Sequence, residues 1–124
     1  MTDQTQQLTA ADLAQFTGTT QYFKHTLGYS YTDGVFFLAE QGRAYWLLDA
    51  IFSYQQDTRI TKNPYLRQIQ FWELTVRDDQ SALLTCFQDT DIPILSQEIP
   101  FTDFPLPKVK IYVQNGVALL PSEY

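Results

Sequence analysis

The chain is most apolar between Tyr31 and Gln56, and this stretch also has the clearest helical pattern. From residue 43 to residue 54 the only strongly polar side chains are those of Arg43, Asp49 and Ser53. A helix that is apolar on nearly all sides cannot lie on a wet surface and must be covered by other elements. We therefore predict a buried central helix over about residues 43–56, covered by the strands that follow it.

A short helix and an ambiguous segment precede this stretch. Thr9 and Asp12 approximate a capping box, which predicts a helix over about residues 10–16. Polar and apolar residues alternate over 21–27, which favours an edge strand, although one helical turn would fit the same residues. Residues 1–7 are polar, and we expect them to be frayed.

A second helix is predicted directly before the central one, over about residues 34–41. Thr32 or Asp33 can cap it, because the side-chain oxygen of either residue accepts a free backbone N–H group. Gly42 then either ends this helix in a left-handed conformation or kinks a single longer helix. Residues 57–65 are expected to form a loop.

From about residue 67 the hydrophobic pattern changes to the alternation that is typical of strands. Asn115-Gly116 is a strong signal for a two-residue hairpin turn, because both positions of that turn need positive φ. With such a turn, Val113 is expected to lie opposite Ala118. The alternation predicts strands at residues 68–77, 82–87, 92–99, 108–114 and 117–120.

These elements predict an α+β fold in one domain. N-terminal helices, including the buried central helix at about 43–56, pack on an antiparallel meander of four to five strands at about 67–120. Residues 101–107 contain two prolines, so they are expected to run as extended chain and to place aromatic side chains on the core. The other face of the sheet carries Ile69, Phe71 and Tyr112. It is expected to be covered by the N-terminal segment or to be used in self-association.

Composition narrows the classes of function. The net charge of −6 and the pI of about 4.4 argue against a nucleic-acid partner, since binding to a phosphate backbone needs a basic face. Cys86 is the only cysteine, which favours a reducing, cytoplasmic location. No secretory signal opens the chain and no apolar run approaches the roughly 20 residues of a membrane span, so no membrane partner is expected.

Asp49 is the most informative polar residue, because it lies in the middle of the most apolar helix. A lone carboxylate is costly to bury there unless it is paired or hydrogen-bonded. It is either a functional group, such as a general base at the bottom of a pocket, or the partner of an arginine, or part of a partly exposed stripe. In the functional interpretation, Tyr31, Asp33 or His25 would assist it.

The remaining candidate residues favour structural roles. His25 is the only histidine, and no second ligand stands at a metal-binding spacing from it. Cys86 lies in an apolar alternation, where a thiol is normally buried and inert, so a Cys86–His25 nucleophile pair is disfavoured. Asp33, Asp49 and Asp103 would form a site for a hard metal only if the fold brought them together. We therefore predict no metal and no cofactor.

Several sequence words stand out in combination. They include YTDGV (31–35), AYWLLDAI (44–51), TDFPL (102–106) and LPSEY (120–124). With these words the chain, from about Leu13 to Tyr124, resembles a family of small bacterial proteins known only as a domain of unknown function. The resemblance implies a bacterial, cytoplasmic, single-domain protein, and it implies no activity.

Two hypotheses of function follow from the sequence. The first is a non-enzymatic, acidic interaction module that forms a homodimer through the face of the strand at 69–76, or binds another protein. The second is a small enzyme or small-molecule binder with a pocket built around Asp49.

Overall fold

The computed structural model describes residues 8–89 and 91–124, so the expectation of a frayed segment at 1–7 lies outside the described residues. The helices are α1 (Ala10–Ala14), α2 (Asp33–Gly42), α3 (Tyr45–Ser53) and α4 (Thr58–Thr61), with the 3-10 turns η1 (Tyr54–Gln56) and η2 (Pro121–Glu123). The strands are β1 (Tyr22–Lys24), β2 (Ser30–Thr32), β3 (Ile69–Val76), β4 (Ala82–Phe87), β5 (Pro93–Ile99), β6 (Lys108–Gln114) and β7 (Val117–Leu119).

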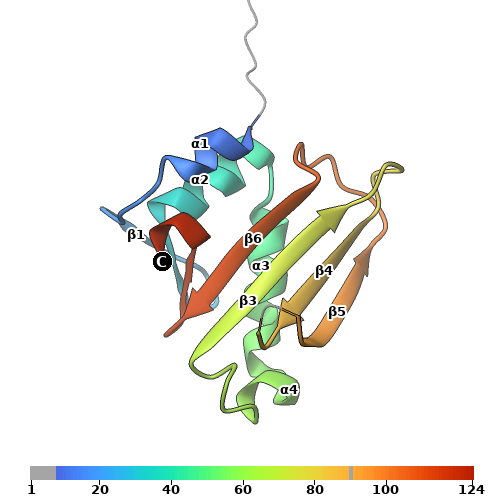
Figure 1. Cartoon of the computed structure of the whole chain (residues 1–124). Helices are drawn as coiled ribbons and strands as arrows, with labels where there is room; N and C mark the ends of the chain where they lie inside the picture. The colour runs from blue at the N-terminus through green and yellow to red at the C-terminus, as the bar shows by residue number, and fades with distance from the viewer. Residues whose placement is uncertain (1–7, 90) are drawn as a thin grey trace, which may run out of the picture.

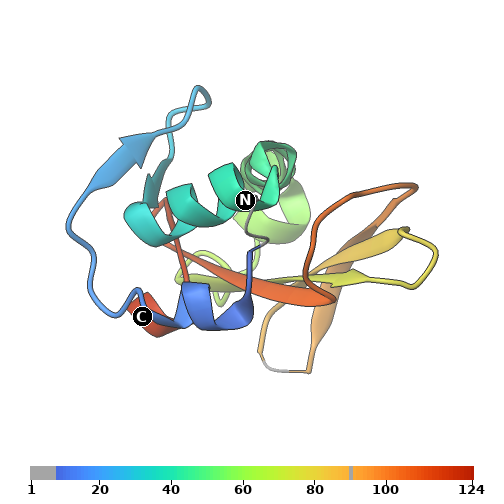
Figure 2. The ribbon, with the colours of Figure 1, turned by 90° about the horizontal axis from the view of Figure 1, so that it is seen from above.

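Within the described residues, the strands form one seven-stranded sheet in the order β1-β2-β7-β6-β3-β4-β5. The helices α2 and α3 cover one face of this sheet, and the β1–β2 end curls towards α2 (Figures 1 and 2). The predicted α+β class is confirmed, with more strands than expected. One pair, β2 with β7, is parallel, and all others are antiparallel.

The predicted central helix is present as α3, which begins at Tyr45, two residues after the expected start. The 3-10 turn η1 continues it to the expected end at Gln56. Its inward side belongs to the same apolar core as Trp72 and Leu74 of β3. Each of the buried α3 side chains is at most 1% exposed, namely Leu47, Leu48, Ile51 and Phe52. Burial against the sheet therefore stabilises a helix whose first residues have no side-chain cap.

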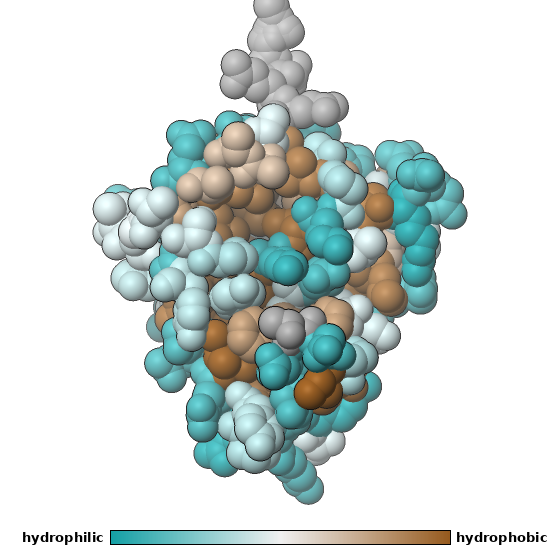
Figure 3. Space-filling view, viewed as in Figure 1, coloured by the Kyte–Doolittle hydropathy of each residue, from teal (hydrophilic) through white to brown (hydrophobic). Residues whose placement is uncertain are grey.

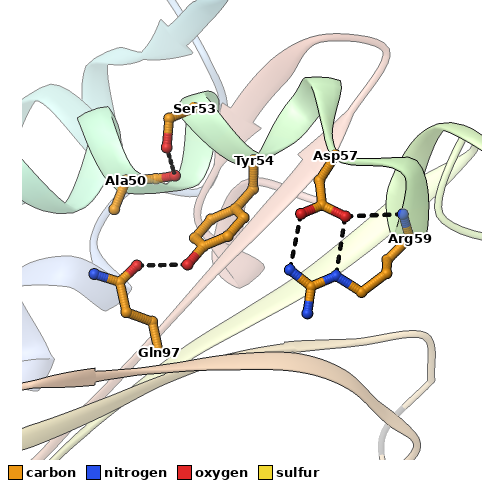
Figure 4. A network of polar contacts seen from close by, with 6 residues as sticks. All are labelled: Ala50, Ser53, Tyr54, Asp57, Arg59 and Gln97. Carbon is orange, nitrogen blue, oxygen red and sulfur yellow. Dashed lines mark hydrogen bonds and ion pairs between the residues drawn. The ribbon is translucent and has the colours of Figure 1, made fainter.

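The end of α3 is fixed by two side-chain hydrogen bonds (Figure 4). The hydroxyl of Ser53 donates to the carbonyl oxygen of Ala50 at 2.7 Å. The hydroxyl of Tyr54 donates to Oε1 of Gln97 in β5, also at 2.7 Å. The second bond joins the helix end to the edge strand of the sheet.

The role predicted for Gly42 is wrong. The residue with positive φ is Arg43 (φ 52°), which caps α2 in the left-handed conformation, while Gly42 is the last residue of the helix itself. A Cβ atom at Gly42 would lie 2.6 Å from Cε1 of Phe104. The glycine is therefore needed because the Phe104 ring packs directly on the backbone, a tertiary contact that the local sequence does not show.

The segment 57–65, predicted as a loop, contains the single-turn helix α4. Asp57 caps it: its Oδ1 accepts the backbone N–H of Arg59 at 2.9 Å, and both carboxylate oxygens bind the Arg59 guanidinium (Figure 4). A helix of four residues is too short to show a hydrophobic period, which is why the pattern did not reveal it.

The N-terminal part of the sheet was only half predicted. The edge strand favoured within 21–27 is present as β1, and the turn after it contains Gly28 at φ 96°. The strand β2 was missed, because its three residues directly precede α2 and read as a helix-capping stretch. It pairs with β1 on one side and with β7 on the other, so it connects the N-terminal strands to the C-terminal part of the sheet.

The C-terminal strands lie where they were predicted, but they do not form the expected meander, because residues 101–107 carry the chain from β5, at one edge, to β6 on the far side of β3. Trp72 lies opposite Cys86 in the β3–β4 pair, and Val113 lies opposite Ala118 around the Asn115-Gly116 turn, whose φ values are both positive. The last strand was expected to reach residue 120, but β7 ends at Leu119. Residues 101–107 run without regular structure; Phe104 is buried as expected, whereas Phe101 is 64% exposed.

The two faces of the sheet are covered unequally. On the second face, η2 packs against β6, and α1 packs beside it against α2 (Figure 2). Where β6, β3, β4 and β5 lie side by side, this second face has no helix over it among the described residues (Figure 1). We call this part of the sheet the outer face.

Candidate functional site

The candidate residues His25 and Asp49 meet. The Nε2 atom of His25 lies 2.7 Å from Oδ1 of Asp49, across the junction between the β1–β2 turn and α3. The backbone N–H of Leu27 donates to Nδ1 at 3.1 Å. Since Nδ1 accepts this bond it carries no proton, so the hydrogen-bond pattern assigns the proton to Nε2, which donates to Asp49.

The His25 ring is therefore held as a structural contact. Its side chain is 9% exposed and packs on Phe52, with the ring centroids 4.8 Å apart. A general base needs a nitrogen that can reach the proton of a substrate. Both ring nitrogens are already engaged, so the arrangement joins the β1–β2 hairpin to α3 and presents no free base.

The expectation that Asp49 is a charge inside the core is wrong, because its side chain is 70% exposed. Tyr45, Asp49 and Ser53 follow each other at intervals of four residues, and all three are exposed. This spacing forms a narrow stripe along one side of the helix. The interpretation of Asp49 as part of an exposed stripe is thus correct, and its partner is His25 instead of an arginine.

Tyr31 and Asp33 do not join this pair. Neither hydrogen-bonds to His25 or Asp49 within the described part of the chain. The ring of Tyr31 stacks on Phe23 with centroids 5.7 Å apart. Asp33 accepts a hydrogen bond from the Thr20 hydroxyl at 2.8 Å. Burial alone would raise the pKa of Asp33, but hydrogen bonds to its charged form outweigh this and hold the pKa below its ordinary value.

A carboxylate that sequence reasoning missed lies at the beginning of α2. Glu123, from η2, accepts hydrogen bonds from the Thr32 hydroxyl at 2.6 Å and from the backbone N–H groups of Leu120 at 2.9 Å and Gly34 at 3.3 Å. A Cβ atom on Gly34 would lie 2.7 Å from this carboxylate, so the glycine makes room for it. The negative group also suits the positive end of the helix dipole.

This contact explains two of the sequence words together. YTDGV supplies the hydroxyl and the glycine, and LPSEY supplies the carboxylate. The two words are about 90 residues apart in the sequence, at Thr32 and Glu123. No local pattern connects them, so the only available signal was their joint presence.

The remaining reactive side chain, the Cys86 thiol, also has a structural role. Cys86 is completely buried, and this burial raises the pKa of its thiol to about 12, so it is not a nucleophile as arranged. Among residues 8–89 and 91–124, no group of three or more His, Cys, Asp or Glu side chains could hold a metal ion. Nor is any helix in these ranges long and apolar enough to cross a bilayer.

The outer face presents a row of aromatic side chains. Phe71 lies opposite Tyr112 of β6 and opposite Phe87 of β4, so the three residues stand side by side across three strands. All three are partly exposed, and Phe71 and Tyr112 meet edge to face at 4.9 Å. Tyr124 extends the contact, with its ring 5.6 Å from that of Tyr112. We call Phe71, Phe87 and Tyr112 the aromatic row.

Two of these three residues were predicted for this face, and Phe87 was missed. The signal for it was present: Phe87 follows Cys86, so the alternation places it on the opposite face, and the hairpin register brings it beside Phe71.

Comparison with known proteins yields a family and no function. Neither the curated proteins nor the solved structures contain a match to the chain. A model described as "Family of unknown function (DUF6876)" matches residues 7–124. With nearly the whole chain matched, this protein belongs to the family DUF6876.

Proposed function

We propose that this protein is a non-enzymatic interaction module that self-associates through the outer face of its sheet. The observation that carries the proposal is the aromatic row, which lies partly exposed on the face that α2 and α3 do not cover. Aromatic side chains bury much apolar area at a small cost in conformational entropy and are enriched at interfaces. Figure 3 views the same face and displays brown, apolar surface between the polar groups.

The row fits a second copy of the same chain. A two-fold interface requires a surface that is complementary to itself. A two-fold axis parallel to the strands and passing between β3 and β4 would place Phe71 of one copy over Phe87 of the other. The same rotation brings Tyr112, on β6, over β5 of the other copy at the level of Pro93, so the two sheets pack face to face.

The charges of the outer face are arranged compatibly with this rotation. Lys108 is exposed on β6, at one side of the face, and Glu98 is exposed at the same level on β5, at the other side, where it also binds Arg77. The rotation that places Phe71 over Phe87 brings β6 of one copy above β5 of the other. Opposite charges then meet at both ends of the interface, which favours this orientation.

The environments of the polar residues that were considered as catalytic candidates support a non-enzymatic function. His25 has no free nitrogen, Asp49 is exposed, and Cys86 is buried. The idea of a pocket built around Asp49 rested on a buried charge, so we do not carry it forward. The net charge of −6 makes nucleic acid a poor partner, and a single buried thiol suits the reducing cytoplasm, which we propose as the location.

Sedimentation at micromolar concentration tests this proposal. We expect the unmodified protein to sediment as a concentration-dependent dimer. The substitution Phe71→Asp places a charge in the centre of the row and is expected to weaken dimerisation by at least about 30-fold, the effect of losing a hot-spot residue. The matched control is Phe101→Asp, since Phe101 is 64% exposed and lies outside the row.

Circular dichroism of each variant separates loss of association from loss of fold. A protein that sediments as a monomer at every concentration contradicts the proposal. So does a folded Phe71→Asp variant that dimerises as well as the unmodified protein.

A further inference from the structure

A hollow that is separate from the aromatic row lies on the same side of the sheet as the outer face, between α1 and the beginning of β6. Its volume is about 350 Å³. Figure 3 displays it as a depression with brown, apolar walls beside α1. Its lining residues come from α1 (Ala10, Leu13, Ala14), from Leu106 and β6 (Lys108, Val109, Lys110) and from Leu120, Pro121 and Ser122. We call it the α1–β6 groove.

We propose that the α1–β6 groove binds an aliphatic carboxylate, that is, a short to medium apolar chain with one anionic head group. This activity is additional to self-association and does not depend on it. The argument rests on the shape and the apolar lining of the groove, and on the charge at its rim.

The lining favours an apolar chain. Leu13 and Leu106 are only partly buried and pack on the core from the sides of the groove. Val109 and Leu120, which also line the groove, are buried residues of the core. The one hydroxyl in the lining, that of Ser122, already donates to the carbonyl oxygen of Leu13 at 3.3 Å. A volume at the lower end of the usual range for ligand pockets, about 300–1,000 Å³, suits a slender ligand.

The rim favours an anionic head group. Lys108 and Lys110 are two residues apart on β6, so both project from the same face of the sheet. Glu73 lies opposite Lys110 in β3 and forms an ion pair with Lys108 at 3.6 Å, so two positive charges stand here against one negative charge. No Asp or Glu lines the groove, and the acid in α1, Asp12, accepts the backbone N–H of Thr9. In a chain of net charge −6 this local excess of positive charge complements a carboxylate.

The experiment titrates hexanoate, octanoate and decanoate into the full chain, using NMR of methyl-labelled Leu and Val with calorimetry for affinity. We expect the methyl groups of Leu13, Leu106, Val109 and Leu120 to shift. Affinity should rise by about twofold to fourfold for each added methylene group. Decanol should bind more weakly than decanoate, and decyltrimethylammonium more weakly still.

Matched variants locate the site. Ala14→Phe fills the groove and is expected to weaken decanoate binding by at least about tenfold, whereas Ala11→Phe, an exposed position of α1 outside the lining, should leave it unchanged. Lys110→Gln should weaken decanoate binding by about threefold to fivefold, the effect of an exposed ion pair, without changing decanol binding. Lys62→Gln serves as the charge control.

Several outcomes overturn the proposal. They are an absence of decanoate binding, affinity that does not depend on chain length, equal binding of the ammonium analogue, or an Ala14→Phe variant that binds normally. Conversion of the protein to a monomer by Ala14→Phe would assign the groove to a second copy and would also overturn it. Phe71→Asp should keep its affinity for decanoate, so failure of self-association and failure of ligand binding are distinguishable.

Discussion

At the scale of single residues, the polar groups that invite a chemical interpretation serve the fold. His25 uses one ring nitrogen for Asp49 and the other for the backbone of Leu27. Glu123 accepts hydrogen bonds from two backbone N–H groups and from the hydroxyls of Thr32 and Thr19. A charged side chain that accepts several hydrogen bonds is expensive to leave unpaired, so each group fixes the position of the segment that carries it.

The contact between Glu123 and Gly34 makes a prediction for a double-mutant cycle. Glu123→Ala should lower the free energy of unfolding by about 1–3 kcal/mol, because it leaves donors at the beginning of α2 without their acceptor. Gly34→Ala should destabilise by about 1–2 kcal/mol, since a Cβ 2.7 Å from the carboxylate displaces it. Urea unfolding of the two single variants and the double variant measures these values.

In the Glu123→Ala background the same Gly34→Ala change has nothing to displace. It should then cost less than about 0.5 kcal/mol, because alanine is intrinsically the better helix residue. Additive effects of the two substitutions would show that the carboxylate and the glycine are not coupled.

At the scale of elements, long and strongly patterned segments were predictable. The apolar run of α3 and the alternation of β3, β4 and β6 identified the core helix and the central strands, because burial on one side imposes a period on the sequence. The short elements β2 and α4 were missed, because the residues of β2 read as the cap of α2 and a single helical turn carries no period. Gly42 was misinterpreted because the Phe104 ring, which requires the glycine, comes from a distant segment.

The candidate site was less predictable than the fold. Sequence reasoning listed His25, Asp49, Tyr31 and Asp33 as possible partners, and the structure brings only the first two together. The exposure of Asp49 depends on which side of α3 faces the sheet. An almost wholly apolar helix does not reveal this, since the polar stripe is only three residues long.

The cap of α4 gives a prediction about pH. The Arg59 hydrogen bonds lower the pKa of Asp57 from 3.8 to about 2, so the folded state binds this proton less readily than the unfolded chain does. The stabilisation is therefore fully present above pH 3.8 and is lost as the pH falls towards 2. Asp57→Asn keeps a capping residue but loses the charge.

We expect the melting temperatures of Asp57→Asn and the unmodified protein to differ near pH 6 and to converge near pH 2, the unmodified protein being the more stable at the higher pH. Thermal melts followed by circular dichroism across this range measure the effect. Asp78→Asn, which removes an exposed acid without such contacts among the described residues, is the control. Parallel pH profiles for Asp57→Asn and the unmodified protein would contradict the assignment.

At the scale of the whole molecule, one core extends from Leu8 to Leu120 and encloses the only thiol. A buried Cys86 reports on opening of this core, because a reagent reaches it only when the sheet separates from α3. Its high pKa slows the reaction further, since the thiolate is the reactive form.

Thiol labelling therefore measures global stability. We expect a disulfide reagent to modify Cys86 in the native protein at least about 1,000-fold more slowly than in concentrated urea, as follows from an ordinary domain stability. A Thr26→Cys, Cys86→Ala variant, with its thiol in an exposed turn, should react rapidly in both conditions. Rapid labelling of native Cys86 would show that the core is open or loosely packed.

The parallel pairing of β2 with β7 has a consequence for synthesis of the chain. Ser30 lies beside Val117, so β2 gains its second neighbour only after roughly 90 further residues have been translated. Until then, β2 pairs only with β1, and the part of α2 that contacts β7 stays uncovered, although both are already translated. The N-terminal strands therefore offer chaperones an unpaired strand edge throughout that interval.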